Sequence, residues 1–310
     1  MRILVSVCLA ASSLYGQPGK IARPSMGFVF DQSAHALRRI EGIPGASLVG
    51  APVEFGFAVS AAYVAPRQDS VFVLAGDGPA RLFRLTADTP LELAVDSLGR
   101  PLGVVYSPSG SAAALYWAGS VRVIKGLPDA PIVAATVSLR ANQRSRRPLP
   151  FTLAVSDDGA YLLYSASGPM ELIGVAGNSR QATDASSGAL AAFAPGGHDA
   201  AVVHTDKLTL FQDIAGSATE RSFPGIAAPA ALAFSPDGQK LFVASATGRA
   251  VTTIQVATGE RSALACDCAP STLIPMGSLF RLNELGAEPL WLLDTASDRG
   301  LVFVPVPAGN

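Results

Sequence analysis

The sequence predicts an all-β protein, a β-propeller of about seven four-stranded blades. Three observations predict it: a turn motif recurs about every 42 residues, short β-branched or aromatic segments flank each copy, and the composition suits a fold with many turns. Of the 310 residues, 30 are Gly and 23 are Pro, whereas 49% are hydrophobic and only 15% are charged. This hydrophobic content argues against disorder, and the abundance of turn residues argues against a helical protein.

The repeat is clearest over residues 231–260, ALAFSPDGQKLFVASATGRAVTTIQVATGE. Strand-like segments alternate there with turns that contain Gly together with Ser, Thr or Asp. In the first turn, Pro236 restricts φ and Gly238 accepts a positive φ, which suits the sequence Ser-Pro-Asp-Gly to a tight turn.

Related turns occur along the chain, at intervals of 42, 49, 38 and 41 residues. They begin at Ala65, Ser107, Ser156, Ala194 and Ser235. A second pattern, IEGIPGA at 40–46, returns two periods later as IKGLPDA at 124–130. A period near 42 with four strands is typical of a propeller blade, and residues 17–310 accommodate about seven.

Some alternatives to seven complete blades stay open. A β-sandwich or a parallel β-helix explains the period less well, and six or eight blades are possible on length. The first and the last copy each show only three clear strands, and residues 19–24 could supply the missing strand of one of them.

The segment FSPDGQKLFVASATGRAVTTIQVATGE resembles the YVTN-type repeat of lactonase-like seven-bladed propellers, many of which are exported bacterial proteins. The resemblance is good for this blade, fair for residues 153–167 and weak elsewhere, where the turn motif has diverged. The resemblance implies an extracytoplasmic propeller. It implies little about which ligand the protein binds or which reaction it catalyses.

The N-terminus predicts export. Arg2, the apolar run 3–14 and small residues near Gly16 are typical of a signal peptide over residues 1–16, which leaves 17–310 as a single propeller domain. The alternative is a buried N-terminal strand. No later apolar run is long enough to span a membrane. We therefore expect a periplasmic or extracellular protein.

The cysteines agree with export, because only Cys266 and Cys268 follow the signal peptide. In an oxidising compartment such a pair suggests a disulfide in a loop between blades. The alternative is a pair of thiolate metal ligands, which we disfavour because the nearest His is His204.

The first strand of each blade should line the central channel, here residues 57–64, 101–107, 151–155, 189–194, 230–235 and 276–282. The only charge in these segments is Arg281. A lactonase-like hydrolase needs carboxylates, His or a metal near the channel mouth to activate water. The sequence thus favours a non-enzymatic binding scaffold, with a lactonase-like hydrolase or lyase as the alternative.

We call the rim with the turns between second and third strands, and with the crossovers between blades, the top rim. Acidic and His side chains predicted there could form a weak site for a divalent cation such as Ca²⁺: Asp31, His35, Asp77, His204, Asp206, Asp294 and Asp298. Ordinary turn chemistry explains them better. We therefore predict no cofactor.

The interval of 49 residues marks an insertion in a crossover, where Arg140, Arg144, Arg146 and Arg147 cluster. These are our candidate contacts for an anionic ligand or a protein partner at the top rim, although a solvated loop also explains them. The formal net charge of −1 argues against nucleic acid as a partner. We expect a monomer.

Overall fold

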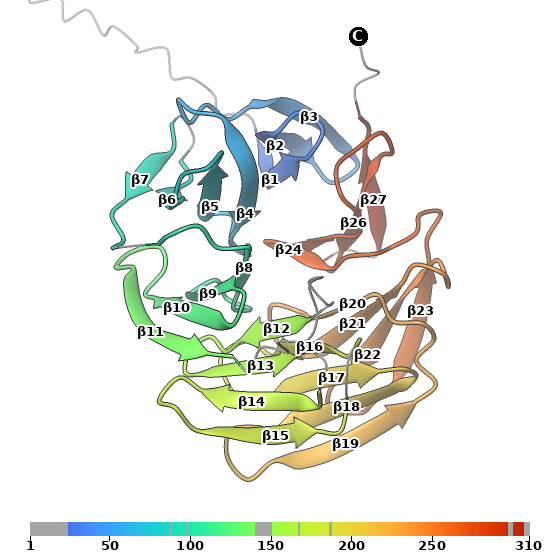
Figure 1. The fold of residues 1–310 in the computed structure, drawn as a ribbon. Coiled ribbons are helices and arrows are strands. Elements are labelled where there is room, and N and C mark those ends of the chain that lie inside the picture. Colours follow the sequence, from blue (N-terminus) through green and yellow to red (C-terminus); the bar gives the residue numbers. More distant parts are fainter. Residues whose placement is uncertain are drawn as a thin grey trace, which may run out of the picture.

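The computed structural model describes residues 24–86, 89–96, 98–139, 151–166, 168–185, 188–296 and 300–306. Over these residues the protein consists of seven antiparallel sheets arranged in a ring, which confirms the predicted seven-bladed propeller (Figure 1). Six sheets have four strands, and the first has three. The described residues include no helix that could cross a membrane.

The blades follow one another along the chain. Blades 1 to 4 consist of β1 (Ser25–Asp31), β2 (Ala36–Ile43) and β3 (Ala46–Pro52); β4 (Val59–Val64), β5 (Ser70–Ala75), β6 (Ala80–Arg84) and β7 (Leu91–Leu93); β8 (Gly103–Tyr106), β9 (Ala112–Trp117), β10 (Ser120–Lys125) and β11 (Ile132–Ser138); and β12 (Thr152–Val155), β13 (Tyr161–Ser165), β14 (Met170–Gly174) and β15 (Ser179–Thr183).

Blades 5 to 7 continue the pattern. They consist of β16 (Leu190–Phe193), β17 (Ala200–His204), β18 (Lys207–Gln212) and β19 (Thr219–Pro224); β20 (Ala231–Phe234), β21 (Lys240–Ser245), β22 (Ala250–Gln255) and β23 (Arg261–Ala265); and β24 (Ile274–Met276), β25 (Leu279–Arg281), β26 (Leu290–Asp294) and β27 (Leu301–Val304). Each strand pairs with the next one along the chain within its blade.

The core is divided among the junctions between blades. One cluster of buried apolar side chains lies between each pair of neighbours, including the pair of first and last blades. Between blades 2 and 3, for example, Phe72 and Leu82 pack with Leu115 and Ile124. Because both faces of every sheet are covered, the middle strands are apolar on both faces, and this is why the hydrophobic alternation along them is only partial.

The Ser-Pro-Asp-Gly turns owe their recurrence to a fixed set of hydrogen bonds. In the turn at Ser235, the serine hydroxyl donates to Asp237 and accepts from the backbone N–H of Lys240 (2.9 Å), while Asp237 accepts from the N–H of Gln239 (3.0 Å). The turn at Ser156 repeats this arrangement with Asp158. These turns join the first and second strands at the bottom rim, opposite the crossovers.

Blade 1 differs from the others. Near the start of β1, the N–H of Phe28 donates to the Oε1 atom of Gln68 (2.7 Å), and Gln68 belongs to a bottom-rim turn. The last residue of β1, Asp31, forms a β-bridge with Leu285 at the top rim. β1 therefore runs from bottom to top, as second strands do, and no inner strand precedes it among the described residues. The predicted three-stranded appearance of this copy is confirmed, whereas residues 19–23 lie outside the described residues.

The expected strands of the last blade need a correction. We predicted 276–282 as its channel strand, but the structure places the first strand at Ile274–Met276, and a turn at Gly277 leads into β25. Arg281 consequently ends a second strand. The inner strand was overlooked because it is only three residues long and contains Pro275, which is unfavourable in strands.

Candidate functional site in the central channel

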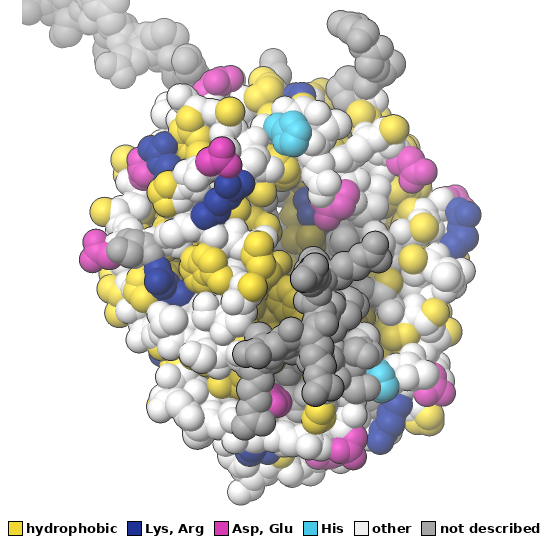
Figure 2. Space-filling view, in the orientation of Figure 1, with side chains coloured by type: hydrophobic (Ala, Val, Ile, Leu, Met, Phe, Trp, Pro, Cys, Tyr) yellow, Lys and Arg dark blue, Asp and Glu magenta, His cyan; other side chains and the backbone are white. Residues whose placement is uncertain are grey.

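The inner strands surround a cavity of about 570 Å³, within the range of small-molecule sites. Every blade contributes to its lining, through β4, β8, β12, β16, β20 and β24 and, in blade 1, through β1. The lining continues to the bottom rim, where Pro66, Pro108, Pro195 and Pro236 of the recurring turns take part. Figure 2 shows hydrophobic side chains on the walls of a recess near the centre of the face in view.

The walls of this cavity are mainly small, aliphatic or aromatic residues. Aromatic rings come from several blades, among them Phe28, Phe193 and Phe234. The described lining includes two charged side chains, Arg67 and Arg281. Arg67 is exposed at the bottom rim and forms an ion pair with Asp69 (2.8 Å), so it belongs to a solvated turn.

Arg281 is the buried cation of the cavity. It is 9% exposed, and its Nη2 atom lies 3.0 Å from the carboxylate of Glu284, whose side chain is 42% exposed. Burial lowers the pKa of the Arg281 guanidinium, and the Glu284 carboxylate acts in the opposite direction. Its buried Nε atom has no hydrogen-bond partner among the described residues.

Arg281 borders the cavity where blades 7 and 1 meet, in the part of the ring that the structure describes. The inner strand of its own blade is short, and the neighbouring blade 1 lacks an inner strand among the described residues. Leu279, two residues before Arg281 on β25, packs in the cluster between blades 7 and 1. Strand alternation places Arg281 on the same face.

Five of the predicted metal-site residues lie at top-rim turns, but they do not gather into one site among the described residues. Asp31 accepts hydrogen bonds from the N–H groups of Ser33 and Ala34 and from Arg38. Burial raises the pKa of Asp31, but the hydrogen bonds from the Ser33 hydroxyl, from the N–H of Ala34 and from Arg38 hold it below its usual value. His35 is exposed in the same turn, and Asp77 pairs with Arg100 (2.7 Å).

In blade 5, His204 and Asp206 flank the turn between β17 and β18. Within the part of the chain that the structure describes, no three His, Cys, Asp or Glu side chains lie close enough together to hold a metal ion. The turn chemistry that we preferred accounts for Asp31, while the metal itself stays an untested alternative.

Asp294 is not at the top rim, contrary to the strand assignment that we made from the sequence. It ends β26, the third strand, and its neighbour Thr295 donates to the carbonyl of Ser278 in the bottom-rim turn of the same blade (2.7 Å). The sequence reading takes β26 as the second strand of the last blade, whereas it is the third, so Asp294 lies at the bottom rim. Asp298 lies outside the described residues.

The predicted arginine cluster, Arg140, Arg144, Arg146 and Arg147, lies outside the described residues as well. Residues 140–150 connect β11, the last strand of blade 3, to β12, the first strand of blade 4. The role of these arginines in binding stays a prediction.

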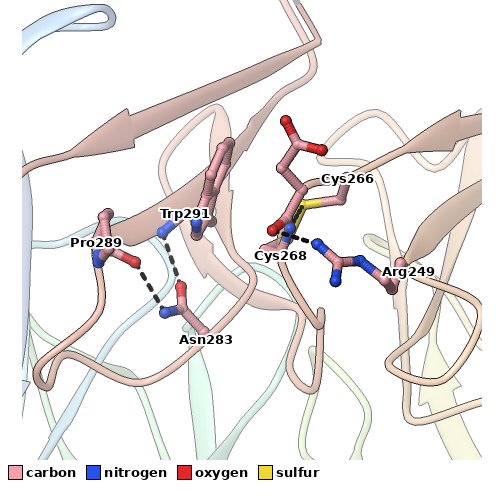
Figure 3. Close-up of a disulfide and its surroundings, with 7 residues drawn as sticks. Arg249, Cys266, Cys268, Asn283, Pro289 and Trp291 are labelled. Carbon is pink, nitrogen blue, oxygen red and sulfur yellow. Dashed lines mark hydrogen bonds between the residues drawn. A yellow bond between two sulfur atoms is a disulfide. The ribbon is translucent and has the colours of Figure 1, made fainter.

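Cys266 and Cys268 are joined by a disulfide in the crossover between β23 and β24 (Figure 3). Both side chains are buried in the cluster between blades 6 and 7, with Leu273 and Phe280. Arg249 donates to the carbonyl of Asp267, which lies between the two cysteines (2.6 Å). The disulfide thus anchors this crossover against the core, a structural role.

Two features of the cavity were missed by sequence reasoning. The channel segments expected from the sequence do not include Phe28 and Phe30, whereas in the structure both residues line the channel. Arg281 is the only charge in the expected channel strands, and it is absent from the site residues that the sequence predicts. A lone cation in an otherwise uncharged channel was the signal that could have identified it.

No family model matches the sequence, and no curated protein matches it. Several solved structures have a similar fold. Hydrazine synthase of Kuenenia stuttgartiensis is 16% identical, with a TM-score of 0.58 over 92% of this chain and 99% of that one. A protein of Bacteroides fragilis described as "a putative 6-phosphogluconolactonase" is 16% identical, with a TM-score of 0.58 over 93% and 96%.

The apo form of AztD from Citrobacter koseri is also similar, at 14% identity and a TM-score of 0.55 over 88% of this chain and 92% of that one. Likeness at such identities shows the fold alone. The ring of blades and these comparisons define the class of protein: a seven-bladed β-propeller with an apolar central cavity. The finer YVTN assignment stays a resemblance.

Proposed function

We propose that this protein is an exported propeller that binds a ligand in its central cavity without transforming it. The observation that carries the proposal is the cavity itself: about 570 Å³, bounded by all seven blades and mainly apolar. Cavities of this size and character bury most of a small ligand, and a closed ring holds their walls rigid. Export is proposed from the N-terminal residues.

Hydrolysis is the alternative, favoured by the resemblance to lactonase-like repeats and by the fold shared with the Bacteroides protein. A hydrolase needs a group that activates water, usually a carboxylate, an imidazole or a bound metal. The described cavity lining contains no Asp, Glu or His. Binding therefore accounts for this lining better than hydrolysis does.

The proposal can be tested by a substitution that fills part of the cavity. Ala191 lies on the inner strand β16 and lines the cavity, so Ala191→Trp should occupy part of it. The matched control is Ala134→Trp on the exposed outer strand β11. With Nile red as a neutral fluorescent probe, we expect saturable binding by the wild type and the control, and at least tenfold weaker binding by Ala191→Trp.

Equal binding of Nile red by both variants would exclude the cavity as the site. The same purified proteins should be incubated with a simple lactone such as δ-valerolactone. Hydrolysis above the uncatalysed rate that Ala191→Trp abolishes would establish the alternative function.

A further inference from the structure

We propose that the central cavity binds a monocarboxylate with an apolar body, the carboxylate contacting Arg281 and the apolar part lying along the inner strands. This inference rests on the proposed binding function and specifies the chemical class of its ligand. The candidates are fatty acids of medium length and aromatic acids of similar volume.

The first support is the cost of burying a cation. Arg281 lies among apolar side chains at 9% exposure, where a charge is costly unless it is paired and hydrogen-bonded. A guanidinium has five N–H donors, and the structure gives Arg281 one acidic partner, through Nη2. The buried Nε–H is left without an acceptor among the described residues.

The second support is geometry. The Nε and Nη2 atoms of a guanidinium form one edge, which matches the two oxygens of a carboxylate in a bidentate contact. Glu284 accepts from Nη2 of that edge. Because the side chain of Glu284 is itself 42% exposed, it can turn into solvent when a ligand carboxylate takes its place.

The third support is charge balance and shape. Arg281 is the one buried charge in the described lining, so a monoanion neutralises it, whereas a dianionic phosphate would leave a negative charge among apolar walls. The remaining lining, which includes Phe28, Phe193 and Phe234, favours an apolar body. A monocarboxylic acid has both features.

The experiment compares decanoate with decanol, which has the same chain length and no charge, by isothermal titration of the purified protein below the micellar concentration of decanoate. We expect the wild type to bind decanoate at least tenfold more tightly than decanol. Arg281→Met should bind both with the affinity of decanol. Glu284→Gln should bind decanoate several times more tightly, because it removes the competing carboxylate.

A thermal melt checks that Arg281→Met is folded, and Glu284→Gln tests the proposal even where Arg281→Met is not. Equal wild-type affinity for decanoate and decanol, both lost in Ala191→Trp, would overturn the carboxylate assignment and leave the binding function intact. Decanoate binding that Arg281→Met leaves unchanged would also overturn it. If Nile red and both decyl compounds fail to bind the wild type, the proposed function fails too.

Discussion

At the scale of single residues, the disulfide between Cys266 and Cys268 holds one crossover against the core. The two cysteines lie in one crossover, and their side chains fill the junction between blades 6 and 7. A disulfide that closes so short a loop removes little entropy from the unfolded chain. Most of the local stability must come from burial of the surrounding side chains.

We therefore expect reduction of this disulfide to lower the melting temperature by only about 2–3 °C, roughly 1 kcal/mol for a domain of this size. Mass spectrometry of the purified protein, before and after alkylation, should find Cys266 and Cys268 protected until a reductant is added. Two free thiols, or a metal bound in equal amount, would contradict the assignment.

At the scale of elements, the recurring turn explains why the repeat is visible at all. Its serine and aspartate replace backbone partners at a tight bend, and this pair of residue types occurs in the turns at Ser156 and Ser235. Asp157, in the turn at Ser156, links the bottom-rim turns of neighbouring blades. Its carboxylate accepts hydrogen bonds from the N–H of Ser109 (2.7 Å) and from the N–H of Gly196 (2.8 Å).

Asp237 allows a test of this turn by pH. The hydrogen bond from Ser235, followed by that from the N–H of Gln239, holds the pKa of Asp237 below its ordinary value. A carboxylate with a lowered pKa in the folded state stabilises the fold above its unfolded pKa of about 4, and that stability is lost as the pH falls through the folded pKa.

Asp237→Asn should thus lower the free energy of unfolding at pH 7 by about 1 kcal/mol, a modest loss because the side chain is exposed. The difference from the wild type should disappear on acidification below pH 4, as measured by urea unfolding at several pH values. Asp206→Asn, at an exposed top-rim turn, is the control and should change little. A pH-independent difference would contradict this explanation.

At the scale of the whole molecule, ring closure depends on a few contacts between the ends of the chain. Gln68 is central to them: its Oε1 accepts from the N–H of Phe28, and its Nε2 donates to the carbonyl of Pro275 (3.3 Å). One side chain of blade 2 thus joins blades 1 and 7 at the bottom rim. Apolar packing between blades 7 and 1, including Val29 and Leu292, completes the seam.

Gln68→Ala should therefore destabilise the ring by about 1–3 kcal/mol, because it leaves buried backbone groups without partners. Hydrogen exchange should show the loss of protection concentrated in β1 and β24. Gln212→Ala, at an exposed position of β18, is the matched control. A uniform loss of protection over all blades would show that Gln68 has no special role in closure.

The sequence by itself determined the blade repeat, the bottom-rim turns and five of the channel strands, since each depends on hydrogen bonds and side-chain patterns within a few neighbouring residues. Only the tertiary structure decided that blade 1 presents Phe28 and Phe30 to the channel, that Arg281 is buried in the cavity wall, and that Asp294 faces the opposite rim. These features arise at the seam, where Gln68 and Pro275 meet although 207 residues separate them. A local pattern contains no information about which distant segments come together, because that is determined by closure of the ring.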